Sequence, residues 1–248
     1  MAKVIKRPSA LKAEFLRLKA KFKNCLLTLL LFILTSVIGN LIMQAQAVYN
    51  LGLAVTGVSV FGFLVCIVII ISVQNELTIK GQGLVGEDAA AGVLAEGLND
   101  SYTIIQNVVV TLEGKSSEID LVVLGPNGIF VVETKNRNGV IEGGYDKDKW
   151  RQHKIGRRGG EYSAEFYSPV KQVGTHIFRL AGFLRQNNIR FHICGAVYFS
   201  NPEAKVRLSG EVDKIPVFSK PEELILYIKM NNSNLSAETK ESVINLLK

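Results

Sequence analysis

Two long apolar stretches dominate the first third of the chain. Residues 25–43 and 51–73 contain no charged residue, and the link between them, 44–50, is short and also uncharged. About 20 apolar residues at 1.5 Å each cross the ~30 Å hydrocarbon core of a bilayer. A buried helix of a soluble domain rarely runs so far without a charge. The pattern therefore predicts a hairpin of two transmembrane helices.

The distribution of charge predicts how this hairpin is oriented. Residues 1–24 are rich in Lys and Arg, with Glu14 as their single acid, and they account for the chain's net charge of +7. Positively charged flanks stay in the cytoplasm. We therefore expect a multi-pass protein of a bacterial inner membrane with both termini cytoplasmic, whose basic N-terminal segment also suits an anionic lipid surface. The sequence Ala45-Gln-Ala47 leaves a cleaved signal peptide as the alternative.

After the second span the pattern changes to short alternating and helical segments. A polar linker, 74–82, comes first. A helix, three strands, a helix and a strand then follow at 83–99, 103–111, 118–124, 128–135, 169–186 and 191–200. This order predicts an α/β domain, a mixed sheet flanked by helices in the order αβββαβ.

Two further segments of this domain are less regular. Residues 136–167 form a polar insert rich in glycine and charge. A C-terminal extension, 201–248, has a short strand near 215–218 and two helices near 221–230 and 236–247. We place the domain core at 80–200, between the membrane hairpin and this extension.

Several classes of protein are excluded by what the sequence lacks. The chain has three cysteines and three histidines, and their spacing fits no zinc site, disulfide framework or catalytic triad. It also has no P-loop and no dinucleotide-binding glycine fingerprint. The candidate chemistry therefore rests on carboxylates and lysine.

The predicted hairpin 118–135 places such groups together. If Pro126-Asn127 is its loop, Gly125 faces Gly128, Asp120 lies opposite Glu133, and Glu118 lies opposite Lys135. Side chains alternate between the faces of a strand, so all four polar groups share one face. Opposed Cβ atoms are only ~5 Å apart, and two carboxylates that close repel unless a cation lies between them. The hairpin therefore indicates a divalent-metal site beside a lysine.

An ordinary structural explanation stands beside this one. Polar clusters are common at the open end of an exposed hairpin, and Glu118 can simply form a cross-strand salt bridge with Lys135.

The ordered set of motifs resembles the nuclease-related domain, NERD, of the PD-(D/E)xK nuclease superfamily. The resemblance covers roughly 80–200. It rests on Gly83-Leu-Val-Gly86-Glu87, Glu118-Ile-Asp120, Glu133-Thr-Lys135, Trp150, Pro169-Val-Lys-Gln172 and His176. Asp120 follows an isoleucine, as in NERD, and not the proline of the superfamily's name. The resemblance implies a restriction-endonuclease-like core.

The same resemblance implies phosphodiester hydrolysis assisted by Mg²⁺ or Mn²⁺. Asp120 and Glu133 would bind the metal, because hard cations prefer carboxylate oxygens. Lys135, Glu87 and Gln172 complete the implied catalytic set. For Glu87 the alternative is an acid that complements a helix dipole, and for Gln172 a helix cap.

The polar insert is a candidate nucleic-acid interface. Lys149 and Arg151 flank Trp150, Arg157 and Arg158 follow in the same insert, and these four cations can contact a phosphate backbone. His176, one helical turn after Gln172, can contact a substrate phosphate or can be a half-buried structural histidine. The alternative for the insert is a solvated loop, since acids are interspersed with the cations.

These features together predict a membrane-anchored, metal-dependent nuclease at the cytoplasmic face, acting on DNA in preference to RNA. The alternative is a non-catalytic nucleic-acid-binding or scaffolding membrane protein that retains the nuclease fold. A complete Asp120, Glu133 and Lys135 set favours the enzyme.

Overall fold

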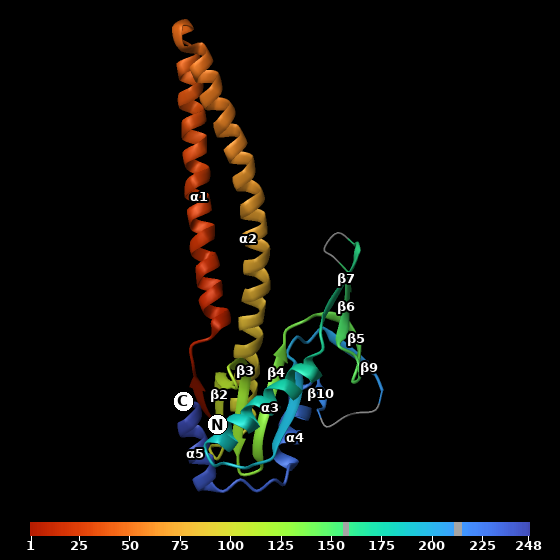
Figure 1. Ribbon diagram of the computed structural model, residues 1–248. Helices are drawn as coiled ribbons and strands as arrows, with labels where there is room; N and C mark the ends of the chain where they lie inside the picture. Colours follow the sequence, from red (N-terminus) through yellow and green to blue (C-terminus); the bar gives the residue numbers. More distant parts are fainter. Residues whose placement is uncertain (156–158, 211–214) are drawn as a thin grey trace. The chain divides into compact units, whose positions relative to one another are not determined.

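The computed structural model describes residues 1–155, 159–210 and 215–248 (Figure 1). The chain forms two compact units. One is a helical unit, Ala10–Gln82, and the other combines Met1–Ser9 with Gly83–Lys248. The residues before the first helix therefore belong to the same unit as the C-terminal two thirds of the chain.

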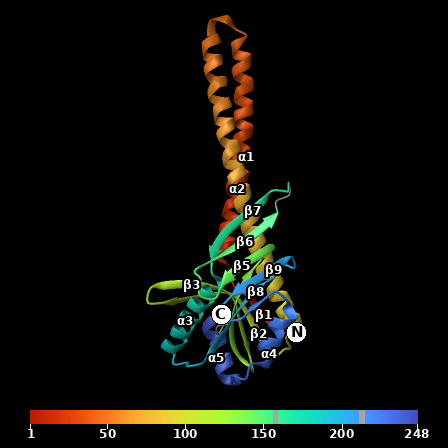
Figure 2. The ribbon, with the colours of Figure 1, turned by 90° about the vertical axis from the view of Figure 1, so that its right-hand side faces the viewer.

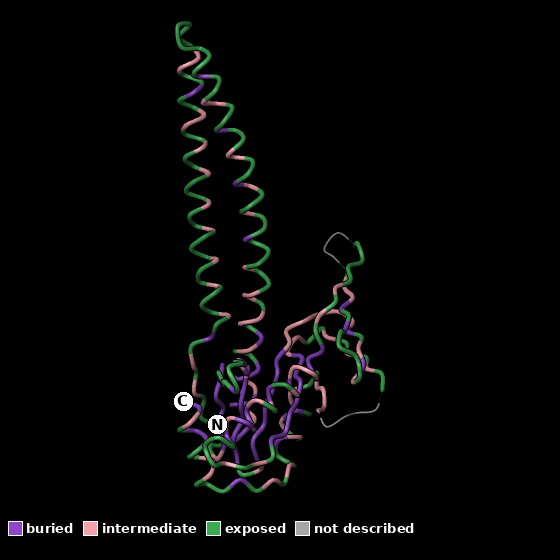
Figure 3. Tube along the Cα trace, in the orientation of Figure 1, coloured by how far each residue is buried: buried purple, intermediate pink, exposed green. Residues whose placement is uncertain are grey.

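The helical unit is a hairpin of two long helices, α1 (Ala10–Met43) and α2 (Tyr49–Gly97), joined through a single 3-10 turn, η1 (Gln46–Val48). Both helices are long and apolar enough to cross a membrane. Only 6% and 11% of the residues in their most apolar 18-residue stretches are buried. Figure 3 shows this as mostly exposed helix. The expected linker 74–82 is instead part of α2, which continues unbroken to Gly97.

The two helices of the hairpin approach closely where their side chains are small. A Cβ atom added at Gly39 would lie 2.5 Å from Thr56 Oγ1, and one added at Gly52 would lie 2.7 Å from the Gly39 carbonyl oxygen. The hydroxyls of Thr35 and Ser59 lie 2.9 Å apart across the same contact. Small residues and interhelical hydroxyl contacts are typical of helix pairs in lipid.

The second unit is built on a mixed six-stranded sheet in the order β1-β2-β3-β4-β8-β10. β2 to β4 form antiparallel pairs, whereas β1, β8 and β10 run parallel to their neighbours. The strands are Lys3–Lys6, Thr103–Leu112, Lys115–Gly125, Gly128–Lys135, Ile193–Phe199 and Val217–Phe218. This agrees with the predicted mixed α/β class.

Helices cover both faces of this sheet. One face packs against α3 (Pro169–Gln186) and α5 (Ala237–Leu247), and the other against the last turns of α2 and α4 (Pro221–Met230). Alternation along β4 divides its residues accordingly. Ile129 and Val131 belong to the α3 side, and Phe130 and Val132 belong to the α2 side. The strand is thus buried on both faces, as its continuous apolar run requires.

The N-terminal strand β1 was not predicted. Lys3–Lys6 pairs in parallel with Thr103–Gln106, and the Ala2 amide donates to the Ala95 carbonyl at 2.9 Å. An ion pair of 2.5 Å between Lys6 and Asp88 adds to these contacts. The basic segment 1–24 therefore divides into an edge strand of the domain and the first turns of α1.

The polar insert is also more regular than expected. It forms most of a second sheet, β7-β6-β5-β9, from Glu161–Tyr167, Lys149–Ile155, Gly139–Gly144 and Ala204–Ser209 (Figure 2). Trp150 anchors this sheet. Trp150 is 1% exposed, and its ring stacks on that of Phe199 in the first sheet with 6.3 Å between the ring centres. Its Nε1 donates a hydrogen bond to the Gly144 carbonyl. Trp150 therefore packs within the core.

Candidate active site

Asp120 lies where the pairing of β3 becomes irregular. The β3–β4 ladder has the expected register from Gly125–Gly128 to Leu121–Val132, and it ends just before Asp120. Along the other edge of β3, the ladder with β2 skips Asp120 and its opposite residue Asn107. The φ of Asn107 is 55°, which is unusual for a strand. The Asp120 carboxylate turns to β4, where Oδ2 accepts a hydrogen bond of 2.8 Å from the Thr134 amide.

Glu133 lies at the centre of the candidate site. Its side chain is 2% exposed, and Lys135 Nζ donates to its Oε1 at 2.6 Å. His176 Nε2 lies 3.3 Å from the other carboxylate oxygen, Oε2. Lys135 Nζ also donates to Gln172 Oε1 at 3.1 Å. Four predicted residues are therefore joined by direct contacts.

Local sequence explains how α3 brings Gln172 and His176 to this carboxylate. Glu133 follows Ile129 and Val131 on the face of β4 that α3 covers, so it points to that helix. Ser168 caps α3 by accepting from the Lys171 amide, and Pro169 occupies its first turn. Gln172 and His176 are four residues apart and so share one side of the helix.

Burial and charge repulsion separate the pKa values of the two carboxyls. Burial and the charge of Glu133 raise the pKa of Asp120 well above its ordinary value. Burial also acts to raise the pKa of Glu133, but Lys135 and His176 outweigh it and leave that pKa below its ordinary value. A bound cation would relieve the repulsion between two carboxylates that interact so closely.

Glu87, on α2, has a strongly perturbed pKa. Burial, and then the charges of Glu118, Glu133 and Asp88, raise the pKa of Glu87 to about 7, while Lys135 acts in the opposite direction. Glu87 therefore lies within the electrostatic field of the β4 groups, although it comes from the opposite side of the sheet.

Glu118 does not lie where the alternation of β3 placed it. Its neighbours Ser117 and Ile119 both face α3, where Arg179 donates to the Ser117 hydroxyl. Glu118 therefore points to the other face, where its charge acts on Glu87. Lys135 forms its ion pair with Glu133. The predicted shared face and the Glu118–Lys135 pair are thus wrong, because the irregularity at Asn107 and Asp120 reverses the alternation.

Comparison with known proteins assigns the segment that holds this site. Residues 82–200 match the family model of the nuclease-related domain. This segment is a nuclease-related domain. An uncharacterized protein of Bacillus anthracis is 32% identical over 116 residues, which cover 46% of this chain and 52% of that protein. The chain thus spans about half the length of this curated relative. No solved structure matches the chain.

The nuclease-related domain offers a small set of oxygen donors for a metal. Among the described residues, Thr134 Oγ1 is buried without a hydrogen bond, and the buried Glu133 Oε2 has His176 Nε2 at 3.3 Å but no well-formed hydrogen bond. Within the described residues, no group of three or more His, Cys, Asp and Glu side chains is arranged to hold a metal ion. Mg²⁺ commonly binds through one or two carboxylates and keeps several waters. The carboxylates of Asp120 and Glu133 fit that smaller requirement.

The predicted nucleic-acid residues of the insert are exposed on the second sheet. Lys149 and Arg151 are 70% and 55% exposed, and both pair with Glu165, at 3.7 and 3.0 Å. Arg157 and Arg158 lie outside the described residues. His176, which was also a candidate for phosphate contact, is only 7% exposed and lies against Glu133.

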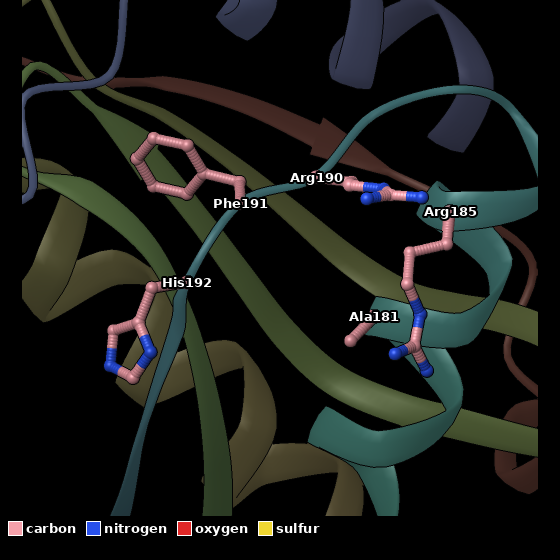
Figure 4. Close-up of a pocket in the computed structure, with 5 residues that line it drawn as sticks. All are labelled: Ala181, Arg185, Arg190, Phe191 and His192. Carbon is pink, nitrogen blue, oxygen red and sulfur yellow. The ribbon is translucent and has the colours of Figure 1, made fainter.

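A separate hollow lies at the other end of α3. It has a volume of about 600 Å³ and is lined by Ala181, Arg185, Arg190, Phe191 and His192 (Figure 4). None of the candidate catalytic residues lines it. The nuclease-related site is instead a polar cluster at the carboxyl end of β4, in which the sequence pattern did not predict the hydrogen bond from the Thr134 amide to Asp120.

Proposed function

We propose that the chain is a membrane-anchored, Mg²⁺-dependent nuclease that hydrolyses phosphodiester bonds, DNA in preference to RNA, at the cytoplasmic face. The main support is the environment of Glu133. A buried carboxylate that contacts a lysine and a histidine, close to a second carboxyl of raised pKa, is costly for folding alone. Such perturbed groups gather at functional sites.

The residues of this cluster have distinct chemical roles in the proposal. The Lys135 ammonium is held by Glu133 and Gln172 and would stabilise negative charge that develops on the phosphoryl oxygens. Glu87 has a pKa of about 7, so it can accept a proton from an attacking water at neutral pH. His176 is a positioning residue, because it contacts Glu133 and is buried.

Asp120 and Glu133 would hold Mg²⁺. The ion would supply Lewis-acid stabilisation of the phosphoryl group and favour ionisation of water. The Thr134 amide orients Asp120, and Lys135 and His176 orient Glu133. Partners of this kind fix metal ligands in productive directions.

The anchoring part of the proposal rests on α1 and α2. Both have the length and apolar composition of a membrane span. The β1–β2 ladder joins residues 1–9 to the domain, so the chain must leave and re-enter on one side of the bilayer. A hairpin of two spans meets this requirement, and the basic flank favours the cytoplasmic side.

A cleavage assay tests the proposal. Full-length protein in detergent is incubated with labelled single- and double-stranded DNA and RNA, with Mg²⁺ or with EDTA. We expect metal-dependent cleavage that Asp120→Asn and Lys135→Ala abolish, while Asp100→Asn, an exposed control, retains it. Nucleic-acid binding without cleavage under every condition would instead support the non-catalytic scaffold.

A further inference from the structure

Arg137 lies two residues beyond Lys135, in the segment that joins the first sheet to β5. Its side chain is half-buried, and contacts from the second sheet hold it in place. Nη1 donates to Gln152 Oε1 at 2.8 Å, and the guanidinium carbon lies 4.1 Å from the centre of the Phe166 ring. The guanidinium is therefore held at one edge by Gln152 and on its planar face by the Phe166 ring.

Gln152 is itself held so that it can accept from Arg137. It is 3% exposed, and its Nε2 donates to the Asn138 carbonyl at 2.7 Å. The amide therefore has its oxygen directed to the guanidinium. Such a supporting contact keeps a binding residue in a defined orientation before any ligand arrives.

The charge of Arg137 has no acidic counter-ion among the residues that the structure describes. Within the described residues, no Asp or Glu carboxylate lies within ion-pair distance of it, whereas Lys135, Lys149, Arg151 and Lys171 each have an acidic partner. Burial lowers the pKa of Arg137, which reflects the cost of removing its charge from water. A half-buried cation without a counter-ion is unfavourable unless an anion completes it.

We propose that Arg137 binds a phosphate of the nucleic-acid strand, next to the phosphodiester that the Lys135 site would cleave. This inference rests on the proposed function for the identity of the ligand. A guanidinium presents five N–H donors in a planar fork that matches two phosphate oxygens. The Gln152 contact uses Nη1, and the guanidinium donates no other hydrogen bond to the described residues, although the Tyr162 hydroxyl lies near enough to act on its pKa. The remaining edge is available for phosphate.

Two alternatives for Arg137 differ in what they predict. If the residue only ties the two sheets together through Gln152 and Phe166, its loss destabilises the protein without changing how binding depends on salt. If it contacts a phosphate, the variant without Arg137 releases one fewer counter-ion from the nucleic acid on binding. The slope of log K against log salt then becomes shallower by about 0.7 for a single strand or 0.9 for a duplex.

The experiment measures binding without cleavage. Full-length protein carrying Asp120→Asn is titrated with a fluorescent 20-nucleotide DNA strand at several salt concentrations, in EDTA, and anisotropy gives the Kd. Arg137→Gln removes the charge, and Arg137→Lys keeps the charge but removes the fork. Arg185→Gln is the matched control, because Arg185 is an exposed arginine at the far end of α3 (Figure 4).

We expect Arg137→Gln to weaken binding about tenfold and to flatten the salt slope by about one phosphate contact. Arg137→Lys should weaken binding less and keep the slope, and Arg185→Gln should match the parent. An unchanged Kd and slope in folded Arg137→Gln would overturn the proposal. If that variant does not fold, unchanged affinity in Arg137→Lys would overturn it instead.

The outcome can be separated from that of the proposed function. Cleavage is measured in the otherwise wild-type chain with Mg²⁺, and phosphate contact is measured in the Asp120→Asn chain without it. If binding depends on Arg137 but the otherwise wild-type chain does not cleave any substrate, the result would contradict the proposed nuclease activity and support the phosphate contact. If the wild-type chain cleaves but binding does not change when Arg137 is replaced, the result would support the nuclease activity and contradict the phosphate contact.

Discussion

His176 Nε2 lies 3.3 Å from Glu133 Oε2, and the two side chains are only 7% and 2% exposed. A buried histidine against a buried carboxylate orients that carboxylate, and outer contacts of this kind commonly contribute 10–100-fold to metal affinity or activity. The contact and the burial together therefore favour a role for His176 in supporting Glu133 over contact with a substrate phosphate.

His176→Ala should lower cleavage by about 10–100-fold and raise the Mg²⁺ concentration needed for half-maximal rate. The measurement is the initial rate across a Mg²⁺ titration. His192→Ala, at an exposed position, is the control and should leave both quantities unchanged. A loss of rate with an unaltered Mg²⁺ midpoint would point to substrate contact and against the positioning role.

Asp120→Asn tests the metal site through stability. The charge of Glu133 and burial raise the pKa of Asp120, so removing its charge should leave the metal-free protein as stable as the parent, or slightly more stable. Mg²⁺ or Mn²⁺ should raise the melting temperature of the parent, because the ion binds the folded form. Asp120→Asn should lose most of that rise.

Two comparisons make this test specific. Lys135→Ala should abolish cleavage but keep the metal-dependent rise, since lysine is not a ligand. Asp100→Asn, exposed and remote in the chain, should behave as the parent in every respect. Equal destabilisation of metal-free Asp120→Asn and Lys135→Ala would indicate a purely structural network.

Glu87 predicts a dependence of stability on pH. Its pKa is about 7 in the folded protein against an ordinary value of 4.5, so the folded state holds a proton that the unfolded state has released. For an acid whose pKa is raised, stability is highest below the ordinary value and falls as pH rises to about 7. Removing the carboxyl by Glu87→Gln should abolish this loss.

Urea unfolding in EDTA at pH 5 and pH 8 measures the effect. Glu87→Gln should stabilise the protein more at pH 8 than at pH 5, by on the order of 1 kcal/mol because solvent screens this partly exposed carboxyl. Glu96→Gln, exposed on the same helix, should show no such difference. The same shift in both variants would mean that general charge, and not the environment of Glu87, causes it.

The parts of the fold that were predicted are those with strong local periodicity. Helix 169–186 has Val173, Leu180 and Leu184 on its buried side and Pro169 in its first turn, and the structure places α3 at those limits. The hairpin turn was found because Gly125 and Gly128 flank a two-residue loop between β-branched runs. Local rules are sufficient where a segment's own pattern decides its structure.

The parts that were missed depend on distant partners. β1 has only four residues, Lys3–Lys6, and its partner β2 begins at Thr103, so no local pattern reveals the pairing. The structure brings the candidates Glu133, Lys135, Gln172 and His176 into contact, but the sequence pattern did not predict these contacts. Glu118 faces the other side because Asn107 interrupts β2, and a single irregular residue reverses an extrapolated alternation.

The β1 strand predicts that the domain needs its N-terminus. Deleting residues 2–7 removes the ladder with β2, the Lys6–Asp88 ion pair and the bond from Arg7 Nη1 to the Leu247 carbonyl. It also exposes Ile104, which is fully buried. We expect a lower melting temperature and faster proteolysis within 83–248, and Val4→Thr, at an exposed position, should have little effect.

The same strand predicts the topology and the processing of the chain. Cleavage after Ala47 would separate β1 from the sheet, so the purified protein should keep residues 1–47 in its intact mass. A phosphatase fusion placed at Gln46 should be active outside the cytoplasm, and one placed after Lys248 should be inactive. A protease-accessible C-terminus in sealed spheroplasts would contradict the cytoplasmic orientation, and loss of the first 47 residues would contradict the hairpin of two spans. The pairing of β1 with β2 requires both ends of the hairpin on one side of the bilayer, and the basic residues of 1–24 favour the cytoplasm as that side.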